Sequence, residues 1–231
     1  MNAKRLWISV ALLLTGLLAV SAAYLLIQLT PKKVTITYNS LPGAQVKLYK
    51  LDSAEELSSV GADKVTGREI EGTIESGKEV VVERGVYAIS VSGNNIESKQ
   101  YPLEVNSDTR KDITINYSQE YLTDLLKETE PTILSVLKSE LPTLPSLYSV
   151  RSSKLYLNGD WYGAQLRYIG TDQYDRDSLR VVLKKNNDGK WELVTKVPEI
   201  IVTRPKYPTI PDSVIAGVNS EEPVKIVPVG E

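Results

Sequence analysis

The first half of the chain carries an alternating run, GVYAISVSG, at positions 85–93. A side-chain period of two is typical of a strand, so we expect one at Val86–Val91. Two turn-forming triplets bound this run, Glu83-Arg84-Gly85 and Gly93-Asn94-Asn95. Similar runs lie at Val34–Tyr38, Ala44–Lys50, Lys78–Glu83, Lys99–Val105 and Lys111–Tyr117. Short strands at this spacing predict a small all-β sandwich over residues 33–117.

Two segments of this half resemble a known family. The run VTIT at 34–37 precedes LPGAQVKL at 41–48, and this order of a strand, a Pro-Gly turn and a second alternating run resembles the opening of PEGA-type and carboxypeptidase-regulatory-like surface domains. The run at 85–93 is similar to the Gly-x-Tyr strand of that family. The Glu of the namesake tetrapeptide is missing, because Pro42 is joined directly to Gly43. The resemblance implies an Ig-like β-sandwich that acts as an interaction or spacer module of envelope proteins, with no catalytic residues.

The pattern changes to a helical period after Tyr117. Apolar residues recur three or four positions apart at Leu122, Leu125, Leu126, Ile133, Leu134, Leu137 and Leu141. Pro131 predicts two helices or one kinked helix, with Thr129 as the cap of the second segment. Strand-like runs follow at Lys154–Leu157, Trp161–Tyr168, Leu179–Lys184, Trp191–Val197 and Ile200–Thr203. We therefore expect an α+β domain over residues 118–220, with one or two helices packed on an antiparallel meander, and a flexible tail at 221–231.

The N-terminal region is apolar. Residues Leu6–Leu29 hold no charged side chain, and at about 1.5 Å per residue they are long enough to cross the hydrocarbon core of a membrane. This predicts an N-terminal transmembrane helix that acts as a signal anchor of a single-pass membrane protein. The flanking charges favour a cytoplasmic N-terminus at residues 1–5, with the remaining domains outside the cytoplasm. The alternative is a signal peptide that is cleaved near Val20-Ser21-Ala22.

Small residues fall four apart in this apolar region, at Ala11, Thr15, Ala19 and Ala23. Such spacing places them on one helical face, where a second transmembrane helix could approach and form a homo-oligomer. The alternative explanation is that small residues are simply frequent in membrane helices.

The composition excludes several functions. The chain has no His and no Cys, so a Ser-His-Asp triad, histidine metal sites and thiolate zinc sites are ruled out. Acidic and basic residues are mixed along the chain, with a net charge of −2, so we expect no nucleic-acid partner. The segment Gly72–Lys78 has the spacing of a phosphate-binding loop, but Glu79 stands where Ser or Thr is needed. We expect no cofactor, no metal and no catalytic residues.

Three weaker patterns supply candidate sites. Ser135 and Lys138 fit Ser-x-x-Lys, in which a lysine activates a serine nucleophile, and the alternative is an ordinary amphipathic helix. Asp172, Asp175 and Asp177 crowd one turn, which is either solvated or a weak cation site. Aromatic side chains at Trp161, Tyr162 and Tyr174 are candidates for contact with a partner or a glycan, whereas Tyr168 and Trp191 are expected in the core.

These observations lead to one principal hypothesis. The chain is predicted to be a membrane-anchored, extracytoplasmic, non-catalytic interaction or assembly protein of the cell envelope, in contact with other envelope proteins and part of a larger surface machine. A glycan-binding surface module is the second hypothesis. A serine-lysine surface hydrolase built on Ser135 and Lys138 is the third.

Overall fold

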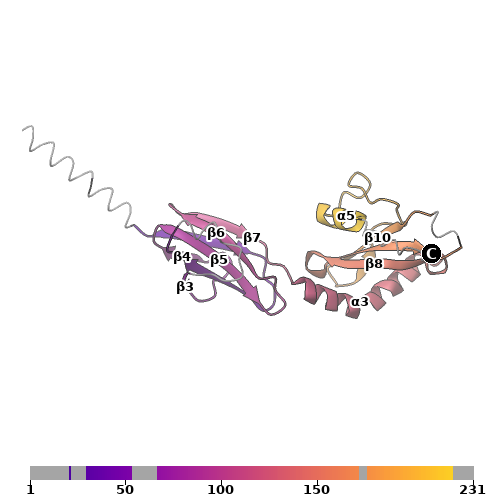
Figure 1. Cartoon of the computed structure of the whole chain (residues 1–231), viewed down its shortest axis with the longest axis horizontal. Helices are drawn as coiled ribbons and strands as arrows, with labels where there is room; N and C mark the ends of the chain where they lie inside the picture. The colour runs from indigo at the N-terminus through magenta and orange to yellow at the C-terminus, as the bar shows by residue number, and fades with distance from the viewer. Residues whose placement is uncertain (1–20, 22–29, 54–66, 172–175, 221–231) are drawn as a thin grey trace, which may run out of the picture. The chain divides into compact units, whose positions relative to one another are not determined.

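The computed structural model of the 231-residue chain describes Ser21 and residues 30–53, 67–171 and 176–220. These residues belong to two compact units, one ending at Ile115 and the other beginning at Asn116. Unit 1 consists of strands, and unit 2 consists of one sheet with helices (Figure 1).

The predicted fold class is wrong. The described part of the chain is mainly β, with three sheets and few helices, and it contains no helix that is long and apolar enough to cross a membrane. The predicted transmembrane segment, Leu6–Leu29, lies outside the described residues except for Ser21, and so do Ala11, Thr15, Ala19 and Ala23. The predicted single-pass signal anchor therefore has no support in the structure. The location outside the cytoplasm stays a prediction.

Unit 1 is formed by seven short strands in two sheets. They are β1 (Lys32–Tyr38), β2 (Ala44–Lys50), β3 (Arg68–Glu71), β4 (Glu79–Val82), β5 (Gly85–Gly93), β6 (Lys99–Val105) and β7 (Thr109–Ile113). One sheet has the order β4-β1-β7, in which β1 is antiparallel to β4 and parallel to β7. The other has the order β3-β2-β5-β6 and is antiparallel throughout. Alternating apolar residues, such as Val34 and Ile36 in β1 and Val46 and Leu48 in β2, are fully buried.

Unit 2 is a four-stranded antiparallel meander of order β11-β10-β9-β8. Its elements are α3 (Gln119–Glu140), α4 (Leu144–Leu147), β8 (Tyr148–Tyr156), the short 3-10 helix η1 (Leu157–Gly159), β9 (Trp161–Tyr168), β10 (Leu179–Lys185), β11 (Trp191–Leu193) and α5 (Asp212–Asn219). The Oγ atom of Ser118 accepts a hydrogen bond from the Tyr121 amide and so caps α3. The helix then runs through Pro131 without a break, so the expectation that Thr129 caps a second helix is wrong.

Helices cover both faces of this sheet (Figure 1). On one face, α3 packs its buried residues Ile133 and Leu137 against a core that includes Tyr162, Leu166 and Leu183. On the other face, α5 buries Val214 and Val218 against Trp161 and Val182. Double coverage explains why every residue from Trp161 to Leu166 is buried, since neither side of β9 faces water. The sequence predicted a helical layer on one face of the sheet only, and the packing of α5 on the second face corrects that expectation.

Candidate functional site

Strand β8 forms one edge of the sheet in unit 2. It pairs with β9, and no other strand lies beside it in the described part of the chain. The pairing shifts between Val150 and Ser152, so Arg151 forms a bulge. An edge strand leaves backbone N–H and C=O groups without strand partners, and bulges are common where pairing must end or change. The surfaces on the two sides of β8 are therefore candidate binding sites.

An apolar groove lies on the α3 side of β8 and has a volume of about 300 Å³. It is lined by Leu134, Leu137, Lys138, Leu144, Pro145, Tyr148, Val150 and Leu166. Leu134 in this groove is 40% exposed, and Leu147 beside it is 44% exposed. Large apolar side chains at such exposure, gathered around one groove, mark a surface that can bind another apolar group.

The groove lies between the C-terminal half of α3, the short helix α4 and the beginning of β8. Leu141 leaves the helix, and its amide still donates to the Leu137 carbonyl at 2.8 Å. The chain then makes the short helix α4 and enters β8 at Tyr148. Side chains two positions apart in a strand point to the same face, so Tyr148 and Val150 of β8 both face the groove. Leu166 of β9, which pairs with Val150, faces it as well. Four elements, α3, α4, β8 and β9, thus supply apolar side chains to one opening.

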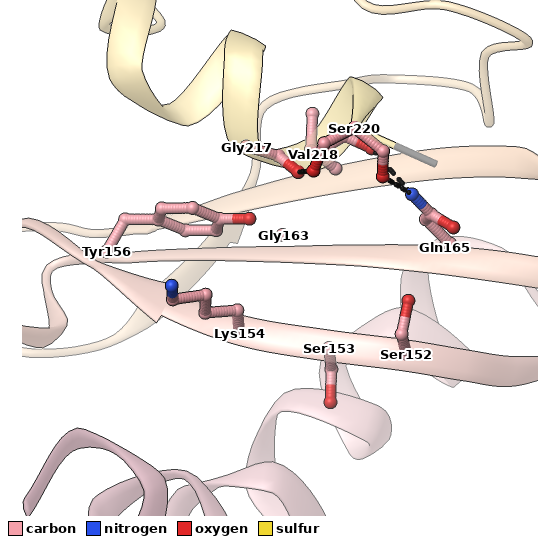
Figure 2. A pocket seen from close by; sticks show the side chains of 9 residues that line it. All are labelled: Ser152, Ser153, Lys154, Tyr156, Gly163, Gln165, Gly217, Val218 and Ser220. Atoms are coloured by element: carbon pink, nitrogen blue, oxygen red, sulfur yellow. Dashed lines mark hydrogen bonds between the residues drawn. The ribbon is translucent and has the colours of Figure 1, made fainter. Parts of the chain in front are cut away.

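A second, polar pocket lies on the α5 side of the same strand and has a volume of about 220 Å³. Figure 2 shows Ser152, Lys154 and Tyr156 pointing toward α5, whereas Ser153 points toward α3. The Lys154 ammonium lies 5.8 Å from the centre of the Tyr156 ring. The Ser153 hydroxyl instead donates to the Glu130 carboxylate at 2.7 Å. The pocket therefore combines one cation with hydroxyl groups.

Two glycines create the space that the Tyr156 ring occupies. A Cβ atom at Gly217 of α5 would lie 2.4 Å from the ring, and one at Gly163 of β9 would lie 3.1 Å from it. Gly217 has no room for a side chain while the ring stays in place, and a side chain at Gly163 would need a neighbouring atom to shift by a few tenths of an ångström. Burial of the ring also raises the pKa of the Tyr156 hydroxyl above its ordinary value.

Gln165 fixes the end of α5 above the pocket. Its side-chain Nε2 donates to the carbonyl oxygens of Val218 at 3.2 Å and of Ser220 at 2.6 Å (Figure 2). Gln165 is only 6% exposed, and it pairs across the sheet with Ser152 of β8. The chain thus leaves α5 above β9, where Ser220 lines the polar pocket.

Comparisons with known proteins give no assignment. No protein-family model matches this chain, and neither a curated protein nor a solved structure matches it. The PEGA-type resemblance of residues 33–117 therefore stays a prediction, and the groove and the pocket must be interpreted from their own chemistry.

The aromatic candidates are mostly internal. Trp161 is 5% exposed and Tyr162 is fully buried, so neither presents a face to a partner or a glycan. Burial and the nearby Glu130 carboxylate raise the pKa of Tyr162, as expected for a core phenol. Trp191 is buried, as predicted, and Tyr168 is half-buried. Tyr174 lies outside the described residues.

The other predicted positions do not form the expected sites. The Ser135 hydroxyl donates to the Pro131 carbonyl at 2.9 Å, a bond within its own helix, while Lys138 lines the apolar groove. Asp172 and Asp175 lie outside the described residues, and Asp177 is exposed. Within the described residues, no three His, Cys, Asp or Glu side chains are grouped so that they could hold a metal ion.

Sequence reasoning missed the groove and the pocket. Leu134 was visible as part of the helical stripe, but the pattern gave no sign that it stays uncovered while Ile133 and Leu137 are buried. Tyr156, Gly163 and Gly217 come from three separate elements, so their contact has no local signal. Only the run of buried residues at 161–166, which includes no charge, could have indicated a strand covered on both faces.

Proposed function

We propose that this chain is a non-catalytic interaction protein whose unit 2 binds an extended polypeptide segment of a partner at the open edge of β8. The observation that carries the proposal is the apolar groove beside this edge, with Leu134 left 40% exposed. A segment that pairs with an edge strand gains main-chain hydrogen bonds, and alternate side chains enter pockets beside the strand. For unit 1 we propose the interaction or spacer role that its family resemblance implies.

The basic side chains around β8 indicate which charge the partner segment should carry. Strand β8 carries Arg151 and Lys154 and no acidic residue, and Lys138 lines the groove. All three of these side chains are exposed. An acceptable segment therefore combines apolar residues at alternate positions with acidic residues near them, because complementary charge favours correct encounter and register.

The absence of a catalytic role is part of this proposal. The chain contains neither His nor Cys, and the Ser135 hydroxyl is bonded to its own helix. These facts support binding over catalysis, because an activated nucleophile needs a base within hydrogen-bonding reach.

Selection from a displayed library of random peptides tests the proposal. We expect the full chain to enrich peptides with two apolar residues at positions i and i+2 and at least one acidic residue. Leu134→Asp should weaken their binding about tenfold or more, because it places a charge in the apolar groove. The control is Leu157→Asp, which changes a similarly exposed leucine, 44%, in η1 away from the groove. Equal binding by the two variants would contradict a site at the groove.

A further inference from the structure

The polar pocket between β8 and α5 is large enough for a small molecule. Its volume of about 220 Å³ gives room for about seven water molecules, at about 30 Å³ each. The described residues that line it include one charged side chain, Lys154, and no acidic group. A ligand that fits this pocket is therefore expected to be small and to carry a negative charge.

Three side chains of β8 supply hydrogen-bond donors to the pocket. The ammonium of Lys154 and the hydroxyls of Ser152 and Tyr156 point toward α5 (Figure 2). Within the described part of the chain, none of these three groups makes a hydrogen bond or an ion pair. Unused donors on one side of a cavity suit a carboxylate, because its two oxygens accept up to about four hydrogen bonds and bind charged donors strongly.

The Tyr156 hydroxyl is held in one place by the packing of its ring. A Cβ atom at Gly217 would lie 2.4 Å from the ring, so the ring fits closely against the backbone of α5. Burial raises the pKa of the hydroxyl, which therefore stays protonated and able to donate at neutral pH. A donor that is already fixed loses little conformational freedom when a ligand binds, and this favours binding.

The opposite side of the pocket is the C-terminal end of α5. The Gln165 side chain donates to the carbonyls of Val218 and Ser220, and the Ser220 hydroxyl donates to the Gly217 carbonyl at 2.6 Å. These carbonyls therefore already have donors, unlike a ligand that enters beside β8. A helix C-terminus carries partial negative charge, which disfavours a ligand with two negative charges, such as phosphate. A single lysine and this helix end together favour a ligand with one negative charge.

We infer that the polar pocket binds a small monocarboxylate. The carboxylate accepts hydrogen bonds from Lys154, Ser152 and Tyr156, and the short apolar part of the ligand lies against Val218 and Gly163. The apolar groove lies on the other face of the sheet and shares none of these residues. The inference therefore does not depend on the proposed function.

Butyrate is the probe that tests this site, and its neutral analogue butyramide is the control ligand. Butyrate should shift the amide resonances of Gly163 and Gly217 in the ¹⁵N-labelled full chain, with a dissociation constant in the millimolar range. Butyramide should bind about tenfold more weakly, because it has no charge to pair with Lys154. Equal binding of the two ligands, or no shift with butyrate at about 10 mM, would overturn the inference. Tighter binding of inorganic phosphate than of butyrate would also overturn it.

Substitutions in β8 test where the probe binds. Lys154→Gln should weaken butyrate binding about tenfold, because it removes the positive charge. Tyr156→Phe should weaken it about threefold, because it removes one donor and keeps the ring. The matched control is Lys190→Gln, since Lys190 is exposed in the turn between β10 and β11 and lines neither the pocket nor the groove. Equal butyrate binding by Lys154→Gln and Lys190→Gln would overturn the inference, while the displayed-library selection judges the proposed function separately.

Discussion

The two faces of the sheet in unit 2 differ in how far each helix covers the edge strand. On the α3 face, the core is apolar up to the edge, and the uncovered part is an apolar groove beside Tyr148 and Val150. On the α5 face, the core is apolar around Trp161 and Val182, and the uncovered part is a polar pocket with Lys154. One strand thus presents an apolar and a basic side, which suits an added segment with apolar and acidic residues.

This difference assigns stability and binding to different residues. Residues under the helices stabilise the packing of helices on the sheet, whereas exposed residues at the edge strand are available to contact a partner segment. Neighbouring positions of α3 and matched glycines can therefore be used to test each role.

The largest effect is expected within α3. Ile133→Ala should lower the free energy of unfolding by about 2–5 kcal/mol, because Ile133 is fully buried and its truncation leaves a cavity. Leu134→Ala should change it by less than about 0.5 kcal/mol, because that side chain is 40% exposed. Urea unfolding of both variants measures the contrast. A large loss in Leu134→Ala would mean that the groove residue belongs to the core.

A smaller effect is expected on the α5 face. Gly217→Ala should destabilise unit 2 by about 1–3 kcal/mol, because the new Cβ would lie 2.4 Å from the Tyr156 ring, although alanine favours helices over glycine. Gly72→Ala is the control, because a Cβ there meets no atom within 4 Å. Thermal unfolding compares the two. A stabilised Gly217→Ala variant would show that Tyr156 moves freely.

The smallest effect concerns pH on the α5 face. Glu199 accepts hydrogen bonds from Lys206 at 2.6 Å and from Tyr207 at 2.5 Å, and these two partners lower the pKa of its carboxyl below the ordinary 4.5. A lowered pKa in the folded state adds stability above the unfolded value, and this stability is lost as the pH falls through the folded value. Unfolding midpoints below about pH 4.5 should therefore fall more steeply in the native chain than in Glu199→Gln. Parallel curves would contradict a role for this carboxylate.

Local patterns in the sequence predicted many strands but not their coverage. Ala44–Lys50 and Lys99–Val105 are strands with the predicted bounds, because alternation is a property of the strand itself. The parallel pairing of β1 with β7 joins residues 75 positions apart, such as Val34 and Thr109, and has no local signal. The groove is lined by side chains from α3, α4, β8 and β9, and the polar pocket places Tyr156 beside two distant glycines. Such features depend on tertiary packing, and no periodicity along the chain encodes them.

The most direct test of the proposed function is amide hydrogen exchange at the two edges of the sheet in unit 2. A saturating peptide from the displayed library should slow exchange in β8, mainly at Tyr148–Val150, because an added strand protects the amides that it pairs with. Exchange in β11, Trp191–Leu193, the other edge of the same sheet, should not change. Protection at β11 equal to that at β8, or no protection at β8, would contradict the account.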